Sequence, residues 1–298
     1  GLDSNEISRY LIQIESELPH KIARKDYNFK WDNKSVPNEI KKDSSTLKKI
    51  DLLFEKGLSP SALNTYLSCP LDFYYKYALR INEKKELEET IENSTQGTII
   101  HEVLEELYKE HSPTITESSV DTMLKTYEAL TDKLYLKQFP SKSYRYGKNL
   151  LYYKMALKEI KLFLTQEKKQ IQKKGPIEIL GLEKPLDTTI EIETSQGKKT
   201  IFLKGNIDRI DSQNGQIRII DYKSGFVKPE DVSVSSIEQV FEKPKAAQLL
   251  FYGYLYNKDN PNSGAISGII SMRNLKQNLI SFSLKEKKGE EKISEEEL

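Results

Sequence analysis

The stretch Gly205–Lys223, GNIDRIDSQNGQIRIIDYK, predicts a β-hairpin around which the rest of the chain can be interpreted. At its centre, Asn214–Gly215 is the strongest short signal for a two-residue hairpin turn, because a type I′ turn needs positive φ at both central residues. If these two residues form the whole turn, counting back along both strands places Asp208 directly opposite Asp221. The hairpin therefore predicts two carboxylates that face each other across a sheet.

Two opposed carboxylates predict a bound cation. They repel each other and destabilise a sheet unless a positive charge lies between them. Side chains alternate along a strand, so Lys223 lies on the same face as Asp221 while Tyr222 points to the other face. A divalent cation would neutralise the pair, and the lysine would meet an anionic substrate. We therefore expect metal-dependent phosphate chemistry at this hairpin.

Length and composition are those of a globular protein with a sizeable core. The 298 residues suffice for one large domain or two small ones. Charged residues make up 31% of the chain and the mean hydropathy is −0.62, so we expect a soluble protein. The apolar runs are too short to span a bilayer, and no signal peptide is visible. The single cysteine, Cys69, excludes an internal disulfide and fits a reducing cytoplasm.

Charge is distributed unevenly, although the formal net charge is only +1. Residues 137–174 are rich in lysine and contain only two acids, Glu159 and Glu167. Such a basic stripe suits a phosphate backbone, and a solvated helix face is the alternative interpretation. The tail, residues 290–298, is mostly acidic.

Domain organisation is predicted from changes of pattern. Residues 1–56 are polar and weakly patterned, and we interpret them as a leader or connector. Residues 57–298 form the main domain, with a helical insertion at about 112–175. Glycine at position 1 and a charged tail suggest a fragment of a longer protein, although a cleaved tag or a trimmed end would look the same.

Helical spacing of apolar residues predicts helices at 97–108, 118–137, 144–173 and 246–256. The first carries His101 at the edge of its apolar stripe, where a hydrogen-bonded boundary residue is the usual interpretation. The last carries Gln248 and Tyr252 four residues apart on one face.

An alternating pattern replaces the helical one at Pro176. It predicts strands at 177–182, 188–193 and 200–211, with turns at Pro185 and at Gln196–Gly197. The second strand of the hairpin is nearly continuous in isoleucine, as expected of a strand that is buried on both faces. The order of helices and strands predicts an α/β fold with a mixed sheet.

Four of these elements together resemble the PD-(D/E)XK nuclease superfamily, in its RecB-type branch. That branch carries the motifs G-x-x-x-H, G-x-x-D-R-x-D, D-Y-K and Q-x-x-x-Y in this order. Here they are filled by Gly97–His101, Gly205–Asp211, Asp221–Lys223 and Gln248–Tyr252. The segment Ser59–Ile81 is also similar to the S-x-S-x-L-x-x-Y-x-x-C-P stretch of AddB-like helicase–nucleases.

The resemblance implies a restriction-endonuclease-like core, in which a central mixed β-sheet is flanked by helices, with an added helical subdomain. It implies a metal-dependent phosphodiester hydrolase that cuts DNA as an exonuclease, within a helicase–nuclease of DNA repair and recombination. DNA and a helicase domain or subunit would then be its partners. Two alternatives stay open: a stand-alone RecB-type nuclease of the CRISPR or phage-recombination kind, and a catalytically silent DNA-binding scaffold.

The resemblance also implies a set of ligands for Mg²⁺ or Mn²⁺: the side chains of His101, Asp208 and Asp221 and the backbone carbonyl of Tyr222. Two carboxylates and a carbonyl are enough protein for Mg²⁺, which keeps several waters. A histidine ligand tilts the preference toward Mn²⁺.

The remaining motif residues receive roles in binding and catalysis. Lys223 would orient or activate the attacking water, or hold the scissile phosphate. Gln248 and Tyr252 would line the DNA channel, Tyr252 by stacking or by bracing the site, unless both simply belong to an amphipathic core helix. Arg209 would meet a phosphate or a surface acid.

One departure from the AddB-like pattern concerns an iron–sulfur cluster. In those relatives the cysteine of the Cys-Pro stretch is one of four cluster ligands, and a cluster needs several thiolates. Cys69 is the only thiol here, so this chain alone cannot build one. Either the cluster has been lost or the remaining cysteines lie outside this stretch.

Overall fold

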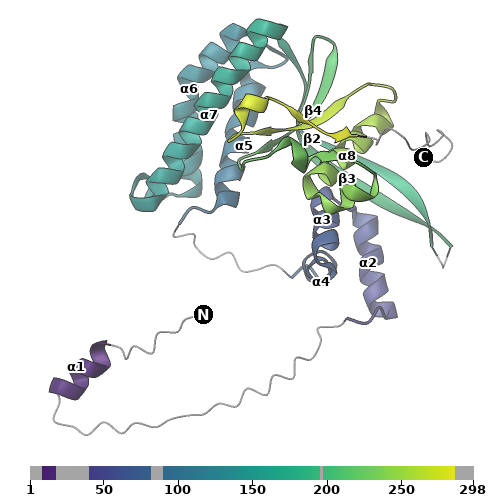
Figure 1. Cartoon of the computed structure of the whole chain (residues 1–298), viewed down its shortest axis with the longest axis horizontal. Coiled ribbons are helices and arrows are strands. Elements are labelled where there is room, and N and C mark those ends of the chain that lie inside the picture. Colours follow the sequence, from purple (N-terminus) through teal and green to yellow (C-terminus); the bar gives the residue numbers. More distant parts are fainter. Residues whose placement is uncertain (1–8, 18–39, 82–89, 195–196, 286–298) are drawn as a thin grey trace. The chain divides into compact units, whose positions relative to one another are not determined.

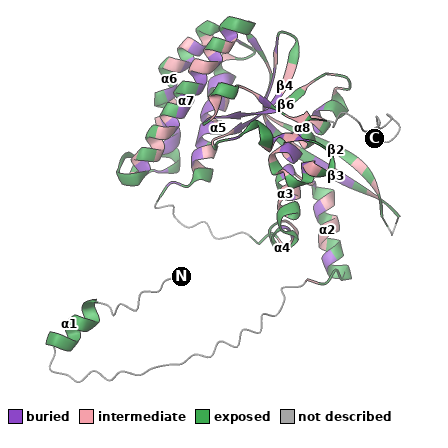
Figure 2. Ribbon diagram, viewed as in Figure 1, coloured by how far each residue is buried: buried purple, intermediate pink, exposed green. Residues whose placement is uncertain are grey.

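The computed structural model describes residues 9–17, 40–81, 90–194 and 197–285 (Figure 1). The chain divides into two units, Gly1–Ile40 and Lys41–Leu298. In the first unit, helix α1 (Arg9–Glu17) is exposed along its whole length (Figure 2). The charged tail 286–298 lies outside the described residues.

A six-stranded mixed sheet forms the centre of the second unit. Its strand order is β1-β2-β3-β4-β6-β7, and only β4 and β6 run parallel. The bounds are β1 (Thr114–Ile115), β2 (Ile177–Thr194), β3 (Gly197–Gln213), β4 (Gln216–Lys223), β6 (Ile266–Ser271) and β7 (Ile280–Ser281). A separate parallel pair joins β5 (Ser233–Val234) to β8 (Ser283–Leu284).

Helices cover both faces of the sheet (Figure 1). α5 (Asn93–His111), α6 (Glu117–Gln138) and α7 (Gly147–Lys174) lie on one side, and α8 (Pro244–Asp259) lies on the other. The smaller helices are α2 (Ser44–Lys56), α3 (Pro60–Ser68) and α4 (Pro70–Phe73), the π-helical turn Tyr74–Ala78, and the 3₁₀ turns Ser143–Arg145, Pro229–Asp231, Glu238–Glu242 and Leu275–Gln277. A mixed sheet between helices confirms the predicted restriction-endonuclease-like fold.

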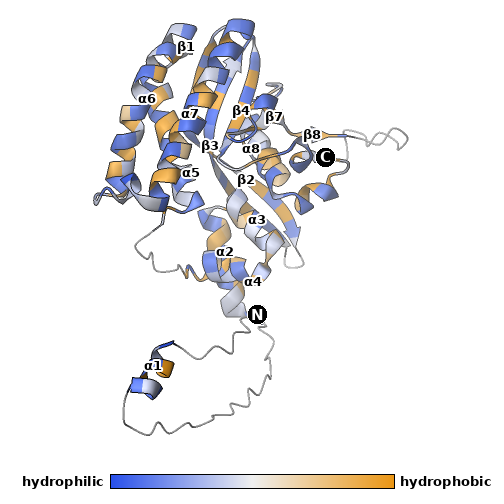
Figure 3. Ribbon diagram, turned by 60° about the vertical axis from the view of Figure 1, so that its left-hand side comes forward, coloured by the Kyte–Doolittle hydropathy of each residue, from blue (hydrophilic) through white to orange (hydrophobic). Residues whose placement is uncertain are grey.

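Alternation of residues divides the core into two main clusters. Ile220 and Tyr222 of β4 pack against α5–α7, whereas Ile219 packs against α8 with Ile210 of β3. Hydrophobic and hydrophilic residues alternate along α5, α6 and α7, as a helix with one buried face requires (Figure 3). β4 is thus buried on both faces, which explains its run of isoleucines.

The predicted hairpin forms in the predicted register. β3 and β4 pair from Gln213↔Gln216 to Arg209↔Ile220, and the turn residues Asn214 and Gly215 have φ of 53° and 77°. One step further along this register, Asp208 lies opposite Asp221. The local turn chemistry therefore fixes where the two carboxylates meet.

The predicted turn at Pro185 is wrong, because β2 runs as one strand from Ile177 to Thr194. Pro185 pairs with Asn206 of β3 on one side. On the other side β1 reaches only Ile177 and Glu178, so the rest of β2 is an edge. A proline lacks the N–H that a central strand needs, but an edge strand tolerates it.

The compact unit begins at Lys41 and therefore includes α2, which packs against β3. Leu58 extends this contact, since its N–H donates to the Phe202 carbonyl at 2.8 Å. The boundary at residue 56 and the insertion at 112–175 stay predictions. Within the described residues, none of the helices combines the length and apolarity needed to cross a membrane.

A Gly215→Ala variant tests whether turn chemistry holds the hairpin. A Cβ at Gly215 would meet no atom within 4 Å, so the whole effect comes from its positive φ. We expect a loss of about 1–2 kcal/mol in the free energy of unfolding, measured by urea denaturation. Gly225→Ala is the matched control, because Gly225 is equally open and has no positive φ; equal losses in both variants would contradict the assignment.

Candidate active site

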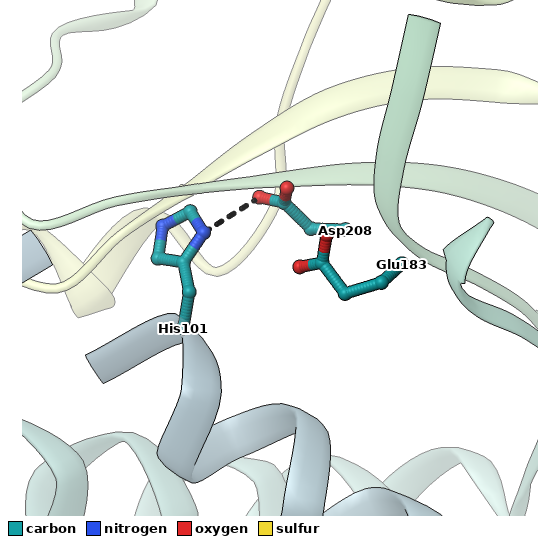
Figure 4. A group of neighbouring side chains, drawn as sticks. All are labelled: His101, Glu183 and Asp208. Atoms are coloured by element: carbon teal, nitrogen blue, oxygen red, sulfur yellow. Dashed lines mark ion pairs between the residues drawn. The ribbon is translucent and has the colours of Figure 1, made fainter. Parts of the chain in front are cut away.

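Three side chains from three elements converge at one end of the hairpin (Figure 4). His101 of α5, Glu183 of β2 and Asp208 of β3 each offer one ligand atom, and these atoms lie within 4.8 Å of one another. The Nδ1 atom of His101 is 3.5 Å from Asp208 Oδ2. The group has the size and the donor atoms of a cation site.

The Tyr222 peptide lies between two of these residues. Its N–H donates to Asp208 Oδ2 at 2.7 Å, and its carbonyl lies 3.0 Å from His101 Nε2. A carbonyl only accepts, so Nε2 carries the imidazole proton and Nδ1 keeps a lone pair that faces Asp208. The structure thus brings together three of the four predicted ligand groups.

Asp221 is held in a second chain of contacts. Lys223 Nζ lies 2.8 Å from its Oδ2, and Gln248 Nε2 donates to its Oδ1 at 2.9 Å. Gln248 also donates to the Tyr252 hydroxyl at 3.1 Å. All four of these predicted site residues are connected, but Asp221 is not in the group whose atoms lie within 4.8 Å.

Burial and mutual repulsion shift the pKa values at this site. Burial and the charge of Asp221 raise the pKa of Asp208 to about 8, although the Tyr222 N–H opposes the rise. Burial, followed by the charge of Glu105, raises the pKa of Glu183. Burial lowers the pKa of His101, which favours the neutral, ligating imidazole. Lys223 thus does not balance the negative charge of the carboxylates, and a divalent cation fits this donor set.

Glu183 is a site residue that the sequence analysis missed. The pairs Leu182↔Arg209 and Lys184↔Ile207 flank it, so it lies across from Asp208 on the other side of β3. Its φ of 41° is rare for a residue with a Cβ and marks a local distortion of β2. Asn206 Nδ2 donates to its Oε2. The pairing of β2 with β3 was the signal that could have revealed it.

Two motif glycines have steric reasons. A Cβ on Gly205 would lie 2.9 Å from Leu255 Cδ1 and 3.0 Å from Tyr252 Cε1, so glycine lets α8 approach β3. A Cβ on Gly97 would lie 3.3 Å from the Ser224 hydroxyl, next to Lys223. Both glycines bring a site helix close to the hairpin.

Two of the predicted side-chain environments need revision. Tyr252 is only 7% exposed and belongs to the core between the sheet and α8, so its ring is not free to stack on a base. Arg209 is fully buried and therefore meets neither a phosphate nor a surface acid. Its partners are buried acids that come from distant parts of the sequence and from its own strand.

Comparison with known families agrees with this geometry. Residues 57–297 match the sequence profile of the PD-(D/E)XK nuclease superfamily. The chain belongs to this superfamily. The match extends over the helical subdomain, the hairpin and α8, and it thus contains every residue of the candidate site.

The relatives that match this chain are much longer proteins, each named as a subunit of an ATP-dependent helicase/deoxyribonuclease. The relative from Alkaliphilus oremlandii is 28% identical over 65% of this chain and 17% of its own length. The relative from Clostridium perfringens gives the same identity and shares. That of Lactobacillus delbrueckii subsp. bulgaricus is 26% identical over 97% of this chain and 25% of its own length. The chain thus spans about a fifth of the relatives it matches.

An Asp208→Asn variant tests the crowding of carboxylates. Because the folded-state pKa of Asp208 lies above its unfolded value, wild-type stability without metal falls as the pH rises from about 4 through 8. Asparagine removes this loss and can still accept from the Tyr222 N–H. In EDTA at pH 8.5 we expect a melting temperature about 2–4 °C above wild type, and a smaller gain at pH 5.

Asp187→Asn is the control, since Asp187 is an exposed carboxylate on the same strand as Glu183. It should leave the melting temperature unchanged at both pH values. A lower melting temperature for Asp208→Asn in EDTA would mean that the carboxylates are satisfied without a cation.

Proposed function

We propose that this chain is a DNA nuclease domain that uses a divalent cation, Mg²⁺ or Mn²⁺, and works as the exonuclease part of a larger repair helicase–nuclease. Phosphodiester hydrolysis follows from the superfamily. The observation that carries the proposal is the set of crowded, partly buried carboxylates around His101, beside a lysine. The names of the relatives support the DNA substrate and the helicase partner.

His101, Glu183, Asp208 and the Tyr222 carbonyl would hold the cation, with Asp221 as a further ligand once it exchanges a contact with Lys223 or Gln248. When bound, the cation acts as a Lewis acid toward phosphate oxygens and lowers the pKa of water. The histidine tilts the preference toward Mn²⁺.

Lys223 and Asp221 act as a pair in this proposal. The Lys223 side chain is about one-third exposed and its ammonium group is held by the buried Asp221 carboxylate, so it would face the substrate with a fixed direction. It would hold the scissile phosphate or orient the attacking water. Neutralising it removes an interaction with the transition state and should lower turnover more than metal affinity.

Gln248 and Tyr252 brace Asp221 in this proposal, and Gln248 also borders the DNA channel. The bracing role rests on the buried Tyr252 hydroxyl and on the bond from Gln248 to Asp221. We expect the protein to act in the cytoplasm. Cys69 is an exposed free thiol and cannot by itself bind an iron–sulfur cluster.

The test incubates the wild-type chain with end-labelled single-stranded and double-stranded DNA and with RNA, in Mn²⁺, Mg²⁺ or EDTA. We expect DNA to be shortened from its ends with Mn²⁺ or Mg²⁺ and to stay intact with EDTA. Asp221→Ala and Lys223→Gln should each lower the rate at least 100-fold, about the contribution of one such group.

The exposed Lys198→Gln is the matched control, because Lys198 lies at the far end of β3. DNA binding without cleavage under every metal would favour the silent scaffold. Cleavage that survives Asp221→Ala would refute the site assignment, and internal cuts would favour a stand-alone endonuclease.

A further inference from the structure

Arg209 is the largest fully buried side chain of the described residues, and each face of it has a partner. Its Nη2 is 2.9 Å from Glu167 Oε1, and its Nε is 2.7 Å from Asp211 Oδ2. Its Nη1 donates to the Tyr222 hydroxyl at 2.9 Å. The guanidinium carbon lies 4.7 Å from the centre of the Tyr108 ring, within cation–π range.

Stability alone is a poor explanation for this network. Arg218 binds Asp211 through two further bonds, so two arginines balance Asp211 and Glu167. Taking four charges out of water is costly, and apolar residues often replace such a cluster without loss of stability. What the network does provide is a fixed position, because one buried guanidinium contacts groups of α7, β3 and β4 at once.

The elements that the network joins are those that carry the proposed ligands. Arg209 follows Asp208 in β3. Tyr222 offers its hydroxyl to Arg209 and its peptide to His101 and Asp208. Tyr108 lies two turns after His101 on α5, and its hydroxyl donates to Glu167 of α7 at 2.9 Å.

We infer that Arg209, Glu167 and Tyr108 form a positioning unit that sets the distance between α5 and the hairpin. Through Tyr222 it holds the carbonyl, His101 and Asp208 in the arrangement that a divalent cation needs. These residues touch neither substrate nor cation. The inference rests on the proposed function and adds the device that holds its site in shape.

Glu167→Gln tests the inference, and Glu159→Gln is a closely matched control. Both glutamates are buried on α7 and each pairs with an arginine, but Glu159 pairs with Arg273 and not with Arg209. Mn²⁺ binding is measured without DNA, by calorimetry and by the rise in melting temperature. We expect Glu167→Gln to weaken Mn²⁺ binding about 10-fold and to slow cleavage, and Glu159→Gln to do neither.

Equal Mn²⁺ affinity in the two variants would overturn the inference. If Glu167→Gln does not fold, Tyr108→Phe replaces it, because this change removes only the hydroxyl that reaches Glu167 and leaves the ring on Arg209; an Mn²⁺ affinity equal to wild type would then be the overturning result. Wild-type protein that neither binds Mn²⁺ nor cuts DNA would refute the proposed function itself, which a difference between variants cannot do.

A second, independent observation concerns the outer surface of α7. Five lysines recur on one face of this helix, and all are exposed: Lys154, Lys158, Lys161, Lys169 and Lys173. The only acids of the helix, Glu159 and Glu167, are buried and do not lie on this exposed face. Lys168, at the flank, is paired with Asp121 of α6. None of the five lysines forms an ion pair with any residue in the described part of the chain.

We propose that this lysine face binds the phosphate backbone of DNA. From Lys154 to Lys173 it extends roughly 28 Å at 1.5 Å per residue. That length corresponds to about eight phosphates along one DNA strand, at 3.4 Å per phosphate. A face that carries several lysines and no acid complements a polyanion. DNA, the substrate in the proposed function, is such a polyanion. Contacts of this kind carry no sequence preference.

The test measures binding of a 25-base-pair duplex by wild-type protein and by the triple variant K154Q/K158Q/K161Q, in EDTA and over a range of salt. We expect binding about 10-fold weaker at 100 mM salt, and a salt slope that is smaller by about 2–3. The control K109Q/K125Q/K133Q removes three exposed lysines from α5 and α6 and should bind within twofold of wild type.

An unchanged slope in the α7 variant would overturn the proposal and leave a solvated face or a site for an acidic protein. Because EDTA prevents metal-dependent cleavage, this test is separate from the proposed activity. Loss of cleavage with intact binding would point to the active site instead.

Discussion

The structure depends on an electrostatic conflict. Asp208 and Glu183 come together in a partly buried place near the buried Asp221, and Lys223 contacts Asp221. Folding creates the repulsion between these carboxylates, because the sheet register brings them close to one another. The pairing of strands therefore places like charges close together at the expense of stability, a pattern that is common at functional sites.

Several contacts around the site hold these carboxylates in place. Glycines at 97 and 205 let the two site helices come close to the hairpin, and Tyr222 joins the site to the core. Behind it, Arg209 brings its own counter-charges, so that the support is neutral while the site itself is not. The unbalanced negative charge is therefore that of the site carboxylates, where a cation and a substrate would lie.

Local chemistry made the hairpin predictable, and distance in the sequence limited the rest. Asn214–Gly215 sets the register of β3 and β4 by itself. The register between β2 and β3 is harder to predict from sequence. A shift by one residue of the turn that joins them changes the partner of Asp208 from Glu183 to Pro185. Glu183 was missed for that reason. The burial of Arg209 was not predicted, because Glu167, which balances its charge, comes from a helix earlier in the chain.

β3 belongs to two hairpins at once, and this has a consequence for how the chain can change in length. Between Gly205 and Ser212 it pairs with β2 on one side and, from Arg209, with β4 on the other. One residue inserted there would reverse the faces of the two side chains. Arg209 would then point into the site, and Asp208 would point into the core. Toward Thr194 and Gly197, β2 and β3 pair with each other and with no third strand in the described part of the chain, so equal changes in the length of both strands there would keep Asp208 opposite Glu183.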